Sequence, residues 1–353
     1  MQLVPYADSS RWRLVLAPVW ALAATLVLSA LLIAWAHAPV GRAYALLLQG
    51  AFGSRFAWSE TLTRATPLIL TGLAVAVAFR ARLFNIGAEG QLYAGALAAV
   101  AVGGLHGGTG WNLPVVILFP AMLAAAALAG ALLLLVPALL KTRFGVDEVV
   151  TTLLLNFIAL LLVSLLLDGP LKDPGAMGWP QSVALNPALE MAPLLAKLRV
   201  SSGLLVAVAV ALVVYVLNQH TVLGFEMRAV GANAVAARFA GMPVGRVVLK
   251  TALLSGAIAG LAGAVEVAGR TTYVTLDMSP GYGYTGIVIA VLAGLHPLGV
   301  VAVAIFIAGI LIGADGMSRT LGVPTYLADV MVAIALLAML TSTMLARYRI
   351  RWR

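Results

Sequence analysis

The sequence has 353 residues, of which 62% are hydrophobic and 10% charged, and its mean hydropathy is +1.04. This excludes an ordinary soluble domain, in which roughly a quarter of the residues are charged. The net charge of +9 does not indicate nucleic-acid binding, because Lys and Arg lie in short loops and at the tail, as topology signals do. The absence of cysteine excludes disulfides and thiolate chemistry. We predict an all-α, polytopic membrane protein with one domain over residues 1–353 and no nucleic-acid partner.

Ten apolar runs are candidate transmembrane helices, because about 20 apolar residues are needed to cross a bilayer. The eighth run is short for a full crossing, and the fourth carries prolines near its ends. The predicted spans are 14–36, 62–79, 84–104, 113–140, 149–167, 203–218, 249–268, 284–295, 298–315 and 326–346.

The distribution of basic residues predicts the orientation. With the N-terminus inside, the inner segments hold more Lys and Arg than the outer ones, including Arg80, Lys141 and Arg238. This excess is typical of cytoplasmic loops. Both termini are therefore predicted to lie in the cytoplasm, as an even number of spans requires.

Two connections are longer than turns. Residues 168–202 carry five prolines, which resist long helices, and are predicted to cover the outer face. Residues 219–248 are predicted to lie inside and are rich in Ala, Gly and Arg, with a short helix over 232–240. Apolar Phe225 and Phe239 lie among the charges of this inner loop, a mixture that suits docking into a groove on a soluble partner.

The most unusual stretch is Phe84–Gln91, which places Asn85, Glu89 and Gln91 at the start of the third span. A carboxylate at the centre of a bilayer costs about 2.5–3.5 kcal/mol on insertion scales, so it usually faces a cavity, a partner or a pathway. These residues can line a substrate path or form an interhelical hydrogen-bond cluster. A proton relay would need further carboxylates in the spans. Glu266 is the candidate, and pairing with Arg270 at i+4 explains it more simply.

Polar residues also open the fifth span. Asp147 and Glu148 fit the N-terminal end of a helix, and we expect both to act there as capping residues. Thr152 and Asn156 are four residues apart and share a face. Asn156 lies in mid-span, where an amide usually meets a partner or lines a cavity.

Gly281–Gly286 has the letters G-x-G-x-x-G, but no strand precedes it and no βαβ unit surrounds it, so nucleotide binding is excluded. We interpret this segment as a flexible or re-entrant start of the eighth span. Tyr282 and Tyr284 are interface aromatics or stacking residues for a ring-bearing substrate. The third and eighth spans run in opposite directions in the predicted topology. This favours an inverted repeat that relates spans 2–5 to spans 7–10.

Membrane-embedded catalysis has no support in the sequence. The four histidines are scattered over loops and span ends, and neither an HExxH motif nor an acidic metal cluster occurs. We expect a transport protein that is not an enzyme, with no metal or cofactor bound by this chain.

Four blocks together resemble a known family. They are FNIGAEGQ at 84–91, DEVVTTLLLN at 147–156, RAVGANAVAARFAGMP at 228–243 and GYTGIVIAVLAGLHPLG at 283–299. In this order they are similar to the permeases of bacterial ABC importers in the branched-chain amino acid and ribose group, above all those for purine nucleosides or simple sugars. Asp147 and His296 depart from the residues common at these positions.

The resemblance implies a bacterial inner-membrane importer. Its parts are two permeases, identical or paralogous, two ATP-binding subunits and an extracytoplasmic binding protein. ATP and Mg are bound by the ATPase partner. The resemblance also implies that the loop 219–248 contains the coupling helix, with Arg228, Gly231, Asn233, Ala236, Ala237, Arg238 and Gly241 as candidate contacts.

The predicted substrate is a nucleoside or simple sugar. Its path would be lined by Asn85, Glu89, Gln91, Asn156, Tyr282 and Tyr284, because a hydroxyl-rich solute needs amide and carboxylate partners to replace water. One alternative is an ion-coupled secondary transporter, which would need more carboxylates in mid-membrane. A second is a membrane-embedded transferase or hydrolase, which would need a catalytic cluster.

Overall fold

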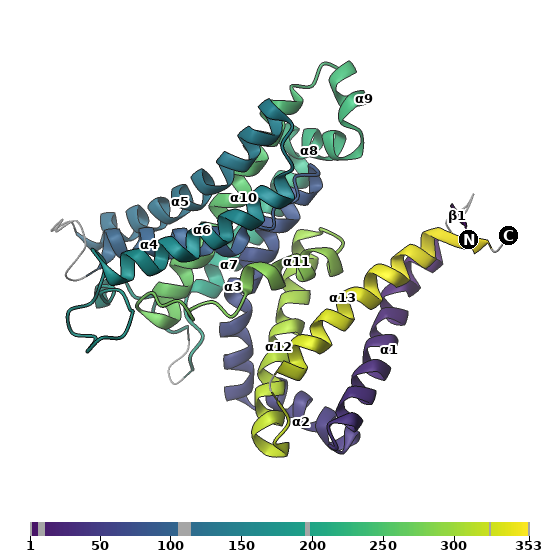
Figure 1. The fold of residues 1–353 in the computed structure, drawn as a ribbon, viewed down its shortest axis with the longest axis horizontal. Coiled ribbons are helices and arrows are strands. Elements are labelled where there is room, and N and C mark those ends of the chain that lie inside the picture. Colours follow the sequence, from purple (N-terminus) through teal and green to yellow (C-terminus); the bar gives the residue numbers. More distant parts are fainter. Residues whose placement is uncertain (1, 6–10, 105–113, 195–197, 325, 352–353) are drawn as a thin grey trace. The chain divides into compact units, whose positions relative to one another are not determined.

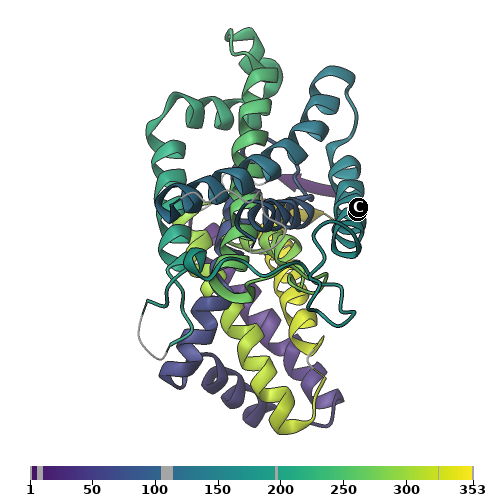
Figure 2. The same ribbon diagram turned by 90° about the vertical axis from the view of Figure 1, so that its left-hand side faces the viewer.

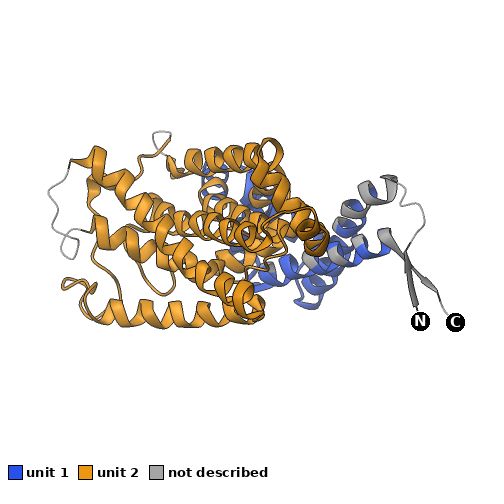
Figure 3. Cartoon of the chain, turned by 90° about the horizontal axis from the view of Figure 1, so that it is seen from above, with its two compact units in different colours: residues 1–61, 306–353 blue, residues 62–305 orange. Residues whose placement is uncertain are grey.

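The computed structural model describes residues 2–5, 11–104, 114–194, 198–324 and 326–351. Residue 113 of the predicted fourth span and residues 195–197 of the predicted outer loop lie outside these ranges. The chain divides into two compact units, one of residues 1–61 and 306–353 and one of residues 62–305 (Figure 3). We refer to them as unit 1 and unit 2.

Unit 1 contains both ends of the chain. Helix α1 (Arg11–Trp35) and helix α2 (Val40–Phe52) meet at a bend of 114°, and α13 (Tyr326–Arg347) packs along α1. Strands β1 (Gln2–Pro5) and β2 (Tyr348–Arg351) pair antiparallel, so the two ends of the chain lie side by side (Figure 1). These short strands are the exception to the predicted all-α fold.

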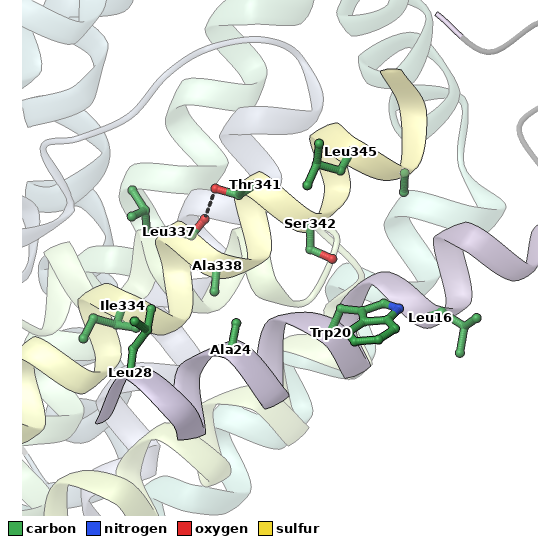
Figure 4. A pocket seen from close by; sticks show the side chains of 11 residues that line it. Leu16, Trp20, Ala24, Leu28, Ile334, Leu337, Ala338, Thr341, Ser342 and Leu345 are labelled. Atoms are coloured by element: carbon green, nitrogen blue, oxygen red, sulfur yellow. Dashed lines mark hydrogen bonds between the residues drawn. The ribbon is translucent and has the colours of Figure 1, made fainter. Parts of the chain in front are cut away.

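The core of unit 1 is small. Ile33, Ala43 and Met317 are fully buried in it. Between α1 and α13 lies an apolar groove of about 640 Å³, with Trp20 and Leu28 on one side and Ile334 and Leu345 on the other (Figure 4). An apolar lining of this kind is expected in a membrane protein, where lipid tails are as apolar as leucine.

Unit 2 holds most of the remaining helices. Helices α3 (Arg55–Arg80) and α12 (Pro297–Leu321) run across the boundary between the units. The others are α4 (Ala88–Gly103), α5 (Val115–Phe144), α6 (Glu148–Asp168), α7 (Gly203–His220), α8 (Val222–Ala232), α9 (Ala234–Phe239), α10 (Val244–Glu266), which continues as the π-helix η2 (Val267–Thr271), and α11 (Tyr282–Leu292).

Seven helices in the described ranges are long and apolar enough to cross a membrane, which makes the chain a multi-pass membrane protein. They are α3, α5, α6, α7, α10 with η2, α12 and α13, and the bent pair of α1 and α2 could supply an eighth. Each predicted span coincides with a helix, but ten crossings are not confirmed. Helices α4 and α11 have only 16 and 11 residues, about 24 and 16 Å of rise, against the roughly 30 Å of a bilayer core.

Glycines allow close packing at the centre of unit 2. Gly256 and Gly260 of α10 lie against the backbone of α5 around Gly130, and Gly263 lies against the backbone of α4. A Cβ at any of these positions would overlap backbone atoms of the neighbouring helix. Small residues at four-residue spacing are typical of helix pairs in membranes. These glycine contacts place α4, which carries Glu89 and Gln91, between α5 and α10.

After Asp168, the last residue of α6, the described residues of the predicted outer connection contain no α-helix, but isolated β-bridges and the 3₁₀ turn η1 (Pro187–Leu189). It is tied to the segment after η2, because Ser182 N donates to Val274 O at 3.0 Å and Leu185 N donates to Thr272 O at 2.7 Å. The absence of long helices here agrees with the effect predicted for its prolines.

Candidate functional site

The candidate site is built where two broken segments of unit 2 meet. Residues 81–87 are not helical and lead into α4, and residues 273–281 are not helical and lead into α11. The first turns of the two helices touch, because Gly283 N donates to Glu89 Oε2 at 2.6 Å. A Cβ on Gly283 would overlap the backbone of Glu89, so only glycine permits this approach.

The first broken segment is held by one polar face of α6. Phe84 N donates to Glu148 Oε1 at 3.2 Å, and Ile86 N donates to Thr152 Oγ1 at 3.2 Å. Asn156 donates through Nδ2 to Ile86 O and accepts from Gly90 N, each at 2.9 Å. Backbone groups in a bilayer must be satisfied within the protein, so this ladder replaces the helical hydrogen bonds that the segment lacks.

A second set of amides braces the same segment from the other side. Asn85 and Gln91 exchange two hydrogen bonds of 2.9 Å, and Asn85 Oδ1 also accepts from Gly87 N at 3.0 Å. Asn85 Nδ2 donates to Ser255 Oγ on α10 at 3.1 Å, and Ser255 donates to Ala74 O on α3 at 2.7 Å. Asn85, Gln91 and Ser255 are buried. These contacts connect three helices.

The second broken segment is held by α3, α4 and its own residues. The hydroxyl of Tyr93 donates to Leu276 O and accepts from Ser279 N. Ser279 Oγ accepts from Tyr282 N at 3.0 Å, and Thr71 Oγ1 donates to Tyr282 O at 3.0 Å. The start of α11 therefore depends on side chains from α3 and α4.

Glu89 lies at the start of both short helices and is 3% exposed. It is in the first turn of α4, and it accepts from the second residue of α11. The N-terminal end of a helix carries partial positive charge, so both helices favour a carboxylate here. The cost of placing this group in an apolar region is thus offset by local backbone dipoles.

The predicted path residues come together in this junction, but they differ in exposure. Asn85, Glu89, Gln91, Asn156 and Tyr282 are buried, whereas Tyr284 is 39% exposed. Tyr284 Oη accepts from Asn156 Nδ2 at 3.1 Å and so connects the network to an accessible surface. Each buried amide has internal partners, as the interpretation of an interhelical cluster requires. Contact with substrate stays a prediction.

Two interpretations of charged residues have a clear outcome. Glu266 pairs with Arg270, as expected from their spacing. Asp147 caps α6 by accepting from Val149 N at 2.7 Å. The prediction that Glu148 is also a cap is wrong, because its carboxylate accepts from Phe84 N and pairs with Lys141 of α5.

In the described residues, no group of three His, Asp or Glu side chains could hold a metal ion.

The predicted coupling loop forms two helices at one end of unit 2, α8 and α9 (Figures 1 and 2). Asn233 separates them and caps α9 by accepting from Val235 N and Ala236 N. Phe239 is 89% exposed, and Ala236 and Arg238 are also exposed, whereas Ala237 is buried. Gly241, with φ of 81°, ends the turn after α9. This end therefore presents a short helix with apolar and basic side chains.

Gly231 and Arg228 of the same loop lie deeper than the sequence suggests. Gly231 is buried, and a Cβ there would overlap the carbonyl of Arg80 at the end of α3. Arg228 is partly buried and donates to Asn218 O on α7. These two residues join the loop to the rest of unit 2.

Several residues of the network were not singled out from the sequence: Thr71, Tyr93, Ser255 and Ser279. Thr71, Tyr93 and Ser255 are ordinary small or aromatic residues within apolar runs, Ser279 lies in a loop, and no local pattern identifies any of them. The role of Glu148 could have been predicted, because Glu148, Thr152 and Asn156 recur every four residues on one face of a mostly apolar helix.

Comparison with known proteins agrees with these features. Residues 57–340 match the family model for the permease component of branched-chain amino acid transport systems. The chain is 38% identical to the glucose ABC transporter permease protein TsgB13 of Haloferax volcanii, over 99% of this chain and 93% of that protein. It is also 38% identical to the guanosine ABC transporter permease protein NupP of Bacillus subtilis, over 93% of each.

A third relative is more distant. The nucleoside ABC transporter permease protein NupB of Lactococcus lactis is 28% identical, over 92% of this chain and 90% of that protein. All three relatives are membrane components of ABC transporters. A family match over most of the chain, together with relatives of this similarity, shows that the protein belongs to the family of permease components of branched-chain amino acid type transport systems, as a transport subunit and not an enzyme.

Proposed function

We propose that the chain is the permease subunit of an ATP-driven importer for a nucleoside or a simple sugar. The substrate class is supported by the relatives that carry glucose, guanosine or nucleoside in their names and that align over more than nine-tenths of this chain. Glucose and the ribose of nucleosides are both neutral and rich in hydroxyl groups. The polar junction at α4 and α11 suits such a solute.

The observation that carries the proposal is the exposed end formed by α8 and α9. Phe239 and Val235 are 89% and 65% exposed beside Arg238, and Asn233 fixes the start of α9. A short helix with exposed apolar and basic side chains suits a groove on a soluble subunit. That subunit would bind ATP and Mg and hydrolyse ATP, and the loop 219–248 would couple hydrolysis to transport.

The arrangement of the broken segments supports an inverted repeat of spans 2–5 and 7–10. Helices α4 and α11 are both short, both follow a non-helical stretch, and they meet at their N-terminal ends. Discontinuous helices that meet with their N-termini at a central site are typical of transporters with inverted repeats. In this topology both termini are cytoplasmic, in the bacterial inner membrane, within one permease domain over residues 1–353.

The substrate would reach the permease from an extracytoplasmic binding protein that docks near the loop 168–202. A second permease, identical or paralogous, would complete the path. Tyr284, as the exposed member of the network, would contact the substrate first, with Asn156 and Glu89 behind it. Asn85, Gln91 and Tyr282 would support this surface.

The test is reconstitution of the chain with the ATPase subunit, second permease and binding protein encoded beside it. We expect ATP-dependent uptake of radiolabelled guanosine or glucose into vesicles. Phe239→Ala and Arg238→Glu should abolish substrate-stimulated ATP hydrolysis, whereas Phe144→Ala, which removes another exposed phenylalanine, should not. Uptake driven by an ion gradient without the ATPase would instead support a secondary transporter.

A further inference from the structure

Helix α11 is held at both ends by charged side chains that flank a single connecting segment. At its N-terminal end, Glu89 accepts from Gly283 N at 2.6 Å. In the turn that follows its last residue, Leu292, the guanidinium of Arg80 donates to Leu295 O through Nε at 3.1 Å and Nη2 at 2.9 Å. Arg80 is the last residue of α3 and Glu89 is the second residue of α4. The two residues that flank the α3–α4 connection therefore form hydrogen bonds on both sides of α11.

The signs of these charges match the helix. A negative group at the N-terminal end and a positive group at the C-terminal end both interact favourably with the helix dipole. The backbone is left-handed immediately outside both ends, at Gly281 with φ of 84° and at Gly294 and Leu295 with φ of 58° and 60°. Helix α11 is thus a short helix between two turns, and Glu89 and Arg80 add contacts at its two ends to the packing of Gly286 against α3.

The α8–α9 end contacts the same arginine from the other side. Gly231 lies so close to the carbonyl of Arg80 that a Cβ would overlap it. Arg228, three residues earlier in α8, repels the charge of Arg80. Movement of α8 would therefore push on Arg80 through both backbone contact and charge.

We propose that Arg80 is a positioning residue that transmits movement of the α8–α9 end to α11. The relay runs from Gly231 to the carbonyl of Arg80, then from its guanidinium to Leu295, and so to the helix that carries Tyr284. This inference rests on the proposed function, because it takes α9 as the contact with the ATPase subunit. It identifies Arg80 as the residue through which ATP hydrolysis by the partner subunit acts on the substrate path.

The experiment measures substrate molecules taken up per ATP hydrolysed by the reconstituted transporter, with guanosine and glucose as probes. Arg80→Gln should lower this ratio about fivefold or more, the size of effect expected for coupled sites. The ATPase subunit should still co-purify and hydrolyse ATP. Arg80→Lys keeps the charge and should retain part of the coupling, and Arg143→Gln, which removes an exposed arginine at the end of α5, should match the wild type.

A double-mutant cycle tests the relay itself. Gly231→Ala should also lower the ratio, whereas Gly41→Ala, where a Cβ meets open space, should not. If Gly231 and Arg80 act in series, the double variant should be little worse than either single variant, because residues in one network are not additive.

Three outcomes would overturn the relay: a wild-type ratio in Arg80→Gln, additive effects in the double variant, or loss of the ATPase subunit from the Arg80→Gln complex, which would indicate a structural role. Failure of the proposed function looks different, because the wild-type complex would then show no ATP-dependent uptake at all.

Discussion

The two broken segments of unit 2 resemble each other in form but differ in what holds them. The segment before α4 is bound from outside by three side chains of α6, Glu148, Thr152 and Asn156. The segment before α11 and the first turn of that helix are bound by Tyr93 and Glu89 of α4, by Thr71 of α3 and by Ser182 of the outer connection. The second segment therefore takes its partners from several elements, whereas the first takes most of its partners from one face of α6.

This difference separates a fixed part from an adjustable part. A segment satisfied by a long neighbouring helix cannot move without leaving several buried backbone groups unpaired, which is costly in an apolar region. Helix α11 lies between two left-handed turns and is held at its ends by side chains and in its middle by the close contact of Gly286 with α3. We infer that α4 is the support and α11 the element whose position changes during transport.

The largest effect is expected for Asn156→Leu, which tests the fixed part. It leaves Gly90 N–H and Ile86 C=O unpaired in the core, at about 1–3 kcal/mol each in free energy of unfolding. Denaturation of the purified protein in detergent should show this loss, together with loss of uptake. Thr151→Val on the same helix is the control, because Thr151 bonds only within its own turn. If Asn156→Leu were as stable as the wild type, the hydrogen bonds of Asn156 to Gly90 and Ile86 would not hold this segment in place.

An intermediate effect is expected at the point where the two segments join. Glu89→Ala removes the acceptor of Gly283 N, a hydrogen bond to a charged group worth about 1.5–3 kcal/mol, so initial uptake rates should fall roughly 10- to 150-fold. Glu89→Gln keeps an acceptor and should retain more uptake. Equal rates for the two variants would show that the charge, and not the hydrogen bond, holds α11.

The smallest effect on stability is expected for Tyr284→Phe, which tests the adjustable part. Asn156 keeps its bonds to Ile86 and Gly90, so the free energy of unfolding should fall by only about 0.5–1.5 kcal/mol. If Tyr284 contacts substrate, the KM for uptake should rise while the maximal rate changes little. Tyr273→Phe, at a tyrosine of similar exposure, should leave KM unchanged. An unchanged KM in Tyr284→Phe would remove this residue from the path.

Much of the fold could be predicted because apolar length and helix formation coincide in a membrane protein. Each of the ten apolar runs contains a helix, although residues 84–87 and 293–295 of the predicted spans are not helical. The Asn85–Gln91 stretch lies where several helices meet. Helices α2 and α8 were missed. Helix α2 follows a sharp bend after α1 and is too short to be recognised as a span, and α8 lies in the inner loop, where only a short helix over 232–240 was predicted. Glu148 starts α6 as predicted, but its capping role was wrong, because a carboxylate at a helix start is ordinarily a cap and here it binds Phe84 N and Lys141 instead.

The sequence by itself determined that polar residues gather at the starts of two short spans. The cause is local: glycines break the helices, and carboxylate and amide groups are rare enough in apolar runs to be noticed. Only the tertiary structure decided which partners satisfy them. Asn156 meets Ile86, Arg80 meets Leu295, and Glu89 meets Gly283 across separations of 70, 215 and 194 residues. Such contacts depend on helix packing through glycine seams, which composition and spacing do not specify.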